Sequence, residues 1–223
     1  MMSYSSNKKY KIAIFDMDGT LVDSLYDIAV CYNTALRTVG LPERTPEQLK
    51  LGVGLVLEEF NKLQTPPDTP KEKIDELNRI YYPIYAEHRG DHAKPFPGIP
   101  EMLRKLKNAG LPIAVVSNND PEIVGAQLES FLPGLIEYHV GAAAGIRPKP
   151  HPDTILAVLD KYGLNKSEAV FIGDSDIDIK AAVNAGVDSI GVTWGFRDSP
   201  TLADAGADMI ADTAEELLSF IMG

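Results

Sequence analysis

The sequence predicts an α/β fold in which a parallel sheet, covered by helices on both faces, carries an inserted all-helical segment. Apolar runs typical of buried strands alternate with amphipathic helical patterns from residue 96 onward. A similar run, "KIAIF", stands near the start of the chain. Between these two parts, about seventy residues show helical patterns and no strand pattern.

The first strand is expected over residues 11–15, a short apolar run rich in isoleucine. Such a run is typical of a strand that is buried on both faces. In residues 24–39 apolar side chains recur at three- and four-residue spacing, which predicts an amphipathic helix. Gly40 and Pro42 then end this helix.

Two further helical patterns follow, around residues 55–63 and 71–88. The segment "QTPPDTP" between them predicts a loop, because its three prolines exclude regular structure. We therefore expect residues 1–22 and 96–223 to form the α/β core. Residues 23–95 are expected to form a separate helical domain.

The second part of the chain supplies the remaining elements of the core. Short links between strands and helices indicate a parallel sheet. Strands are expected at 111–118, 169–174 and 188–195, and helices at 99–110, 121–132, 154–163, 178–186 and 213–221.

Composition limits the class of protein. The formal net charge is −11, so bulk charge does not favour binding to nucleic acid or to an anionic membrane. Cys31 is the one cysteine, which excludes an intrachain disulfide and suits a reducing compartment. No apolar run approaches the roughly 18 residues of a membrane span, and the polar start lacks a signal-peptide pattern. We expect a cytoplasmic protein without a nucleic-acid or membrane partner; the sequence does not predict its oligomeric state.

Polar side chains follow three of the expected strands at the point where each ends. Asp16 and Asp18 follow the first strand, Ser117 and Asn118 follow "IAVV", and Asp174 follows "VFIG". Ligands of open α/β sheets bind at the carboxyl ends of the strands. These side chains therefore indicate a single site.

Two carboxylates one residue apart need a cation or a proton, because burying like charges is costly. A carboxylate can act as a nucleophile on phosphorus, provided that the charge of the phosphate is neutralised and its position is fixed. Mg²⁺ prefers oxygen ligands such as Asp16 and Asp174. Lys149 can supply a compact positive charge, and Gly19 allows the backbone to approach a phosphate closely.

Four segments of the chain resemble the four motifs of haloacid dehalogenase-type phosphohydrolases. They are "DMDGT", "VVSNN", Lys149 and "GDSDID", in the family's order and spacing. "VTWGF" and "ADMIADTAEEL" further resemble the phosphoglycolate phosphatase-like branch. The resemblance implies a Rossmann-like core and makes the helical segment between the first and second motifs a cap.

The resemblance also implies roles at the reacting phosphate. Asp16 would be the nucleophile that forms an aspartyl-phosphate. Asp18 would protonate the leaving oxygen and then activate water. Ser117, Asn118 and Lys149 would bind the phosphoryl group.

A Mg²⁺ site is implied beside these residues. Its ligands would be Asp16, the backbone carbonyl of Asp18, and Asp174. Asp178 would support these ligands without binding the ion itself.

The function implied is Mg²⁺-dependent hydrolysis of a small phosphorylated metabolite, with phosphoglycolate as a candidate. A phosphomutase similar to β-phosphoglucomutase shares all four motifs and is the main alternative. A dehalogenase does not need Asp18, which argues against that activity. A phosphonate hydrolase would need a cap lysine in an apolar context, which the sequence does not show. A non-catalytic binding module would not need the complete set of groups.

Several polar residues outside the motifs are expected to be structural. Asp23 and Asp27 stand near a helix start, where acidic side chains interact well with the helix dipole. Trp194 is expected to pack in or at the rim of the core. The four histidines show no common metal-ligand spacing.

Overall fold

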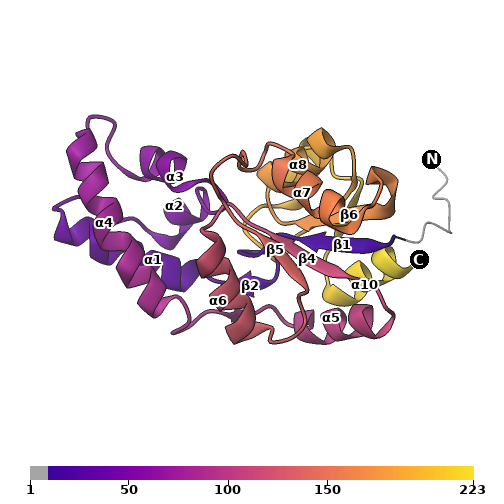
Figure 1. Cartoon of the computed structure of the whole chain (residues 1–223). Coiled ribbons are helices and arrows are strands. Elements are labelled where there is room, and N and C mark those ends of the chain that lie inside the picture. Colours follow the sequence, from indigo (N-terminus) through magenta and orange to yellow (C-terminus); the bar gives the residue numbers. More distant parts are fainter. Residues whose placement is uncertain (1–9) are drawn as a thin grey trace.

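The computed structural model describes residues 10–223 and contains a six-stranded parallel sheet (Figure 1). The strands run in the order β5-β4-β1-β6-β7-β8. Their bounds are β1 Ile12–Phe15, β4 Ile113–Val116, β5 Tyr138–Val140, β6 Ala169–Gly173, β7 Asp188–Val192 and β8 Met209–Ala211. The predicted α/β class with a parallel sheet is confirmed.

Helices cover both faces of this sheet. One face packs against α5 Ile99–Asn108, α6 Pro121–Phe131 and α10 Ala214–Met222, and the other against α7 Asp153–Tyr162 and α8 Asp176–Ala185. In β1, Ala13 and Phe15 belong to the first apolar cluster, whereas Ile12 and Ile14 belong to the second. All four side chains are fully buried, which explains why the strand is a continuous apolar run.

The position of β1 determines where the site can form. β1 pairs with β4 on one side and with β6 on the other, so the chain order reverses at this strand. Such a reversal leaves a crevice at the carboxyl ends of the strands. The loops that follow β1, β4 and β6 therefore meet at one place.

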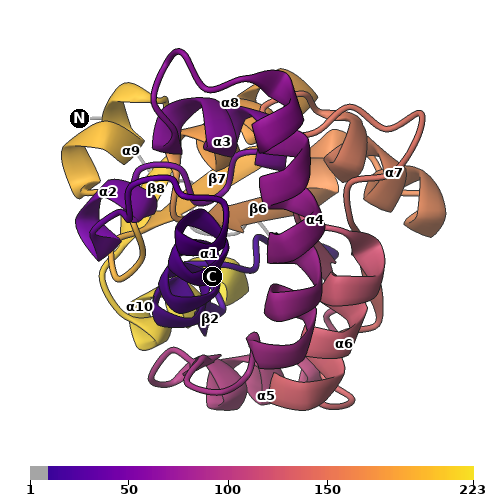
Figure 2. The same cartoon turned by 90° about the vertical axis from the view of Figure 1, so that its left-hand side faces the viewer.

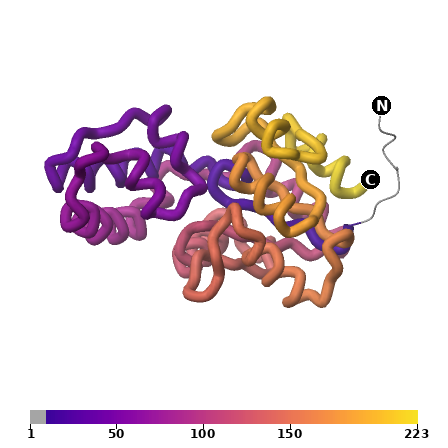
Figure 3. Tube along the Cα trace, turned by 90° about the horizontal axis from the view of Figure 1, so that it is seen from above, coloured from indigo at the N-terminus to yellow at the C-terminus, as the bar shows by residue number. Residues whose placement is uncertain are grey.

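Residues 24–93, between β2 (Val22–Asp23) and β3 (Lys94–Pro95), form a helical segment that projects from one end of the sheet (Figures 1 and 3), and Figure 2 views the molecule from that end. We call these residues the insert. Its helices are α1 Leu25–Thr38, α2 Pro46–Lys50, α3 Leu57–Gln64 and α4 Lys71–His88. They share an apolar cluster of their own, in which Tyr32 contacts Phe60 and Tyr81 edge to face. Among residues 10–223, no helix is long and apolar enough to cross a membrane.

Several short elements were not predicted from the sequence. These are the edge strands β5 and β8, the helices α2 and α9 (Ser199–Asp204), and the short strands β2 (Val22–Asp23) and β3 (Lys94–Pro95). β5 and β8 are three residues long and each contains two half-buried residues, so neither has a distinct alternation of apolar and polar positions. The loop predicted at 64–70 is confirmed between α3 and α4, except that Gln64 is the last residue of α3.

Two connections join the insert to the sheet. β2 and β3 pair in antiparallel fashion, with Asp23 opposite Lys94. Next to this pair, the buried carboxylate of Asp27 accepts hydrogen bonds from the backbone N–H groups of His92 (3.1 Å) and Ala93 (2.9 Å). Asp27 lies in the first turn of α1, as expected, but its carboxylate also fixes the returning chain.

We predict that Asp27→Asn lowers the free energy of unfolding by about 1–3 kcal/mol, because an amide cannot accept both N–H groups as the carboxylate does. The control is Asp23→Asn, an exposed aspartate in β2, which should change the value by less than about 0.5 kcal/mol. Urea unfolding monitored by circular dichroism measures both. Equal effects of the two substitutions would contradict the role assigned to Asp27.

Candidate active site

The side chains predicted at three strand ends do meet in the structure. Asp16 follows β1 and is held by a hydrogen bond from its N–H to Ile172 O of β6 (2.8 Å). Ser117 follows β4, and its N–H donates to Val140 O of β5 (3.0 Å). Asp16 and Ser117 line the crevice between the sheet and the insert, and the buried Asp174, which follows β6, lies next to Asp16.

Lys149 lies at the centre of this arrangement. Its Nζ donates to Asp16 Oδ1 at 2.5 Å and to Asp178 Oδ1 at 2.6 Å. Burial alone would lower the pKa of Lys149, but the two carboxylates outweigh burial and raise it. Lys149 is therefore charged, and it is the only buried lysine or arginine within residues 10–223.

The side chain of Asn118 holds the backbone of Lys149. Its Nδ2 donates to Lys149 O (2.9 Å) and to Gly54 O of the insert (2.8 Å), while its Oδ1 accepts from Lys149 N (2.8 Å). The expected contact of Asn118 with a phosphoryl group stays a prediction. What the structure adds is that this amide positions Lys149 and joins the insert to the core.

A cluster of acidic side chains surrounds the lysine. Oxygens of Asp16, Asp174 and Asp178 lie within 4.8 Å of one another. Burial and the charge of Asp178 raise the pKa of Asp16 well above its ordinary value, although Lys149 opposes this. One ammonium group cannot neutralise three buried carboxylates, so this oxygen-rich set fits a divalent cation.

Asp174 is oriented by the loops around it. Thr20 Oγ1 donates to its Oδ1 (3.0 Å), and the Phe196 N–H donates to its Oδ2 (2.7 Å). Burial, followed by the charge of Asp178, raises the pKa of Asp174 to about 7, against the effect of these two donors. A bound cation would favour the ionised form of this carboxyl.

Asp178 is bound on both of its oxygens. Ser175 Oγ and Ser175 N donate to its Oδ2 at 2.6 and 3.1 Å, which closes a capping box at the start of α8. Its Oδ1 accepts from Lys149. These contacts agree with a supporting role, since the carboxylate binds and orients the Lys149 ammonium group.

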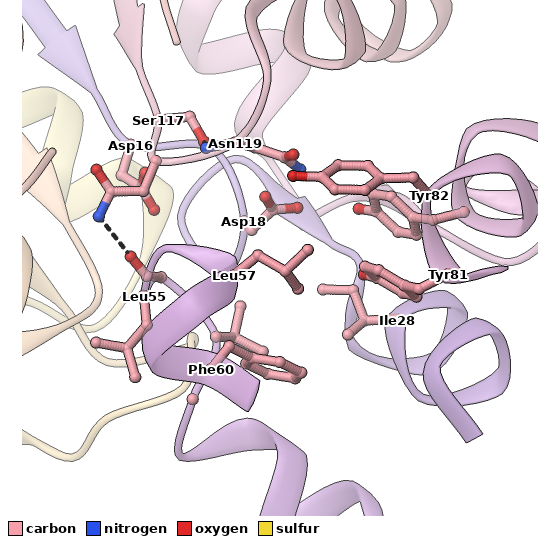
Figure 4. A pocket seen from close by; sticks show the side chains of 15 residues that line it. Asp16, Asp18, Ile28, Leu55, Leu57, Phe60, Tyr81, Tyr82, Ser117 and Asn119 are labelled. Atoms are coloured by element: carbon pink, nitrogen blue, oxygen red, sulfur yellow. Dashed lines mark hydrogen bonds between the residues drawn. The ribbon is translucent and has the colours of Figure 1, made fainter. Parts of the chain in front are cut away.

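Asp18 faces a cavity between the core and the insert, with Ser117 and Asn119 on one side and Tyr81 and Tyr82 on the other (Figure 4). Ser24 Oγ donates to its Oδ1 at 2.6 Å. Burial raises the pKa of Asp18, and the hydrogen bond from Ser24 partly offsets this rise. A carboxyl group in this position can hold a proton and give it to a ligand in the cavity.

The side chain of Asp174 fits against the backbone of Gly19 and Gly195, because neither glycine carries a side chain. A Cβ atom at either position would overlap the carboxylate of Asp174, and Gly19 also has a φ of 92°. Trp194, expected to be structural, donates its indole N–H to Thr20 O (3.0 Å) and so ties this loop to β7. Close approach of the backbone explains the glycine in "DMDGT".

Sequence reasoning missed several groups that orient the predicted residues or join the insert to the core. Thr20, Ser24, Ser175 and the Phe196 N–H orient the predicted aspartates, and Arg197 contacts the insert. Ser24 and Ser175 immediately precede helices, which is the only signal they carry. Arg197 donates to Lys50 O (2.8 Å) and Leu51 O (2.7 Å) of the insert, a contact with no sequence signature.

The chain that forms this site is similar in sequence to known proteins. Residues 13–192 match the family model described as haloacid dehalogenase-like hydrolase. The chain is 32% identical to a phosphoglycolate phosphatase of Mannheimia succiniciproducens, over 96% of this chain and all of the relative. It is 31% identical to a phosphoglycolate phosphatase of Vibrio parahaemolyticus, over 95% and 96% of the two chains.

A solved structure supports the same relationship. A predicted phosphoglycolate phosphatase from Haemophilus somnus superposes with a TM-score of 0.88 and 27% identity, over 98% of this chain and 99% of that one. The expected resemblance to the phosphoglycolate phosphatase-like branch is therefore confirmed. The chain belongs to the haloacid dehalogenase-like hydrolase family and is a phosphatase.

Proposed function

We propose that the chain hydrolyses a small phosphate monoester in a Mg²⁺-dependent reaction that passes through a phosphorylated Asp16. The observation that carries this proposal is the pairing of Asp16 with Lys149 beside Asp174, next to a cavity that Asp18 faces. The names of the relatives support a small phosphorylated substrate, with phosphoglycolate as one candidate.

In the first step, a carboxylate oxygen of Asp16 attacks phosphorus. The bond between phosphorus and the alcohol oxygen breaks, and that oxygen takes the proton held by Asp18. Lys149 keeps Asp16 in place, and its charge offsets that of the incoming phosphate. Ser117 binds a phosphoryl oxygen in this proposal, which its position in the lining of the cavity at the end of β4 supports.

In the second step, Asp18 accepts a proton from water and the resulting hydroxide attacks the phosphorus of the aspartyl-phosphate. The bond between phosphorus and the Asp16 oxygen breaks, which releases inorganic phosphate and restores the carboxylate. Asp18 suits both steps because burial raises its pKa and Ser24 opposes that rise.

Asp16, the backbone carbonyl of Asp18, and Asp174 would hold Mg²⁺, and Asp178 would support these ligands without binding the ion itself. When bound, the ion supplies positive charge that offsets the carboxylates and the phosphate. Thr20 and the Phe196 N–H keep Asp174 oriented for this purpose.

The insert, within the proposed domain bounds 23–95, serves as a cap. It closes the cavity over Asp18 and contacts the leaving group, while the core proposed at 1–22 and 96–223, of which residues 1–9 lie outside the described part of the chain, binds the phosphoryl group. Contacts of Asn118 with Gly54 and of Arg197 with Leu51 hold the two parts together. Exclusion of stray water is a common function of such closure.

We predict that Asp16→Asn lowers kcat by at least about a thousandfold on a generic aryl phosphate, because the nucleophilic charge is lost. The matched control is Asp176→Asn, an aspartate at the start of α8 whose side chain is 29% exposed and pairs with Lys180. Its kcat should stay within about twofold of wild type. Phosphate release measures both; normal turnover by Asp16→Asn would contradict the covalent mechanism.

We predict that a chelator abolishes phosphate release and that added Mg²⁺ restores it. Ca²⁺ should restore little, because it favours longer bonds and more ligands. Asp174→Asn should raise the Mg²⁺ concentration needed for half-maximal activity by at least about tenfold, whereas Asp176→Asn should not. Full activity in chelator would remove the metal from the mechanism.

The same assay separates a phosphatase from a phosphomutase. Hydrolysis releases inorganic phosphate, whereas a mutase returns the phosphoryl group to the sugar. Turnover of a sugar phosphate to its isomer without phosphate release would contradict the proposed function.

A further inference from the structure

Four consecutive residues after β7 contact both the core and the insert. We call this segment, residues 194–197, the strap. Trp194 donates its indole N–H to Thr20 O (3.0 Å), and Gly195 lies so close to Asp174 that a Cβ atom there would overlap the carboxylate. These contacts fix the first half of the strap to the core.

The second half of the strap reaches the insert. In the described part of the chain, Phe196 is the only buried member of the insert's apolar cluster that comes from outside the insert. The Arg197 guanidinium donates from Nη1 to Lys50 O (2.8 Å) and from Nη2 to Leu51 O (2.7 Å). Both carbonyls lie at the end of α2, where a helix offers its carbonyl groups no backbone partner. Arg197 therefore caps this helix from the core.

Arg197 is held by these hydrogen bonds more than by an ion pair. Its side chain is 12% exposed, and the carboxylate of Asp176 is 3.8 Å from its Nε. Asp176 pairs more closely with Lys180, at 2.6 Å. A guanidinium presents its donors in a rigid fork, so two adjacent carbonyl acceptors fix its direction.

Phe196 connects the two parts within a single residue. Its N–H donates to Asp174 Oδ2 (2.7 Å), while its ring lies in the apolar cluster of the insert. If the insert moved away from the core, either the ring would leave that cluster or the N–H would leave Asp174. Both changes are unfavourable, because one exposes a buried apolar side chain and the other removes a donor from a buried carboxylate.

We propose that the strap couples the position of the insert to the orientation of Asp174, with Arg197 as a positioning residue. An insert held against the core keeps Asp174 oriented, and an oriented Asp174 favours the closed position of the insert. This inference rests on the proposed function, in which Asp174 is a metal ligand, and adds a regulatory link to that site. The coupling is reciprocal, so a cation bound at Asp174 should also stabilise the closed insert.

The first test measures binding of Mg²⁺ alone by calorimetry, without substrate. Arg197→Gln should raise the Kd by at least about fivefold, because the insert is no longer held through the strap. Loss of a positive charge near a cation site would by itself tighten binding, so the direction of the change separates the two effects. Tighter or unchanged binding in Arg197→Gln would contradict the proposal.

The control for this variant is Arg44→Gln. Arg44 also donates to a carbonyl, that of Gln64 (2.5 Å), but both residues belong to the insert. Its loss removes a comparable contact without disconnecting the insert from the core, so the Kd for Mg²⁺ should stay unchanged. An equal rise in Arg44→Gln and Arg197→Gln would show a general effect of loosening the insert and would overturn the role of the strap.

A second variant tests the ring of Phe196. Phe196→Ala keeps the backbone N–H that binds Asp174 and removes only the side chain that packs in the insert. The proposal predicts a Kd for Mg²⁺ that is again at least about fivefold higher. Wild-type affinity would mean that Phe196 acts on Asp174 by its N–H alone, without the insert.

The reverse direction is tested without a metal. Spin labels on Leu63→Cys in α3 and Val183→Cys in α8, at positions 50% and 55% exposed, report the distance between insert and core; the buried Cys31 stays in place. Asp174→Ala removes the acceptor of the Phe196 N–H, so the distance distribution should become broader and longer.

The matched control in the labelled protein is Thr154→Val, a buried side chain of α7 in the core. Its distance distribution should match that of the labelled protein without a further substitution. A distribution unchanged by Asp174→Ala, or changed equally by Thr154→Val, would contradict the coupling.

These measurements need no turnover, which separates the inference from the proposed function. If no phosphate ester is hydrolysed but both variants behave as predicted, the proposed function fails and the coupling stands. If hydrolysis is normal but the Kd in Arg197→Gln and the distances in Asp174→Ala are unchanged, only the coupling fails. If the wild type binds no Mg²⁺, the distances decide alone: broadening in Asp174→Ala supports the coupling, and its absence overturns it.

Discussion

The site depends on one buried ion pair network, in which the Lys149 ammonium binds both Asp16 and Asp178. Without this cation, the carboxylates of Asp16 and Asp178 would be buried next to that of Asp174 with no cationic side chain to offset their charge. Removing one partner from such a network is strongly destabilising, because it leaves an uncompensated charge. Asn118 holds Lys149 by its backbone and Ser175 holds Asp178, so residues distant in sequence are fixed around one atom.

The parallel sheet is what makes this network possible. Because β4 and β6 flank β1, three strand ends present their polar residues at the same edge. The sequence therefore carried enough information to predict the four central strands of the sheet, the three longer helices of the insert, and the place of Asp16, Asp18 and Asp174 at the strand ends. Strand ends and motif spacing are local features, and each leaves a pattern in the chain.

Contacts between distant segments leave no such pattern. From the sequence, Asp27 is predicted only as an acidic residue near a helix start. Its contacts with the backbone of His92 and Ala93 form only in the folded chain. Arg197 likewise reaches the carbonyls of Lys50 and Leu51 only after the insert has folded against the core. The insert's residues that line the cavity, such as Ile28, Phe60 and Tyr81, resemble the apolar faces of ordinary helices in the sequence, because the cavity forms only where two parts of the chain meet.

The central claim is that the phosphoryl group is carried by Asp16. The most direct test is to stop the reaction with acid during turnover, reduce the mixture with borohydride, and map the peptides by mass spectrometry. An acyl phosphate on Asp16 would be converted to homoserine at that position. We expect this conversion at residue 16 and nowhere else. A modified carboxylate at another position, or none while phosphate is being released, would contradict the account.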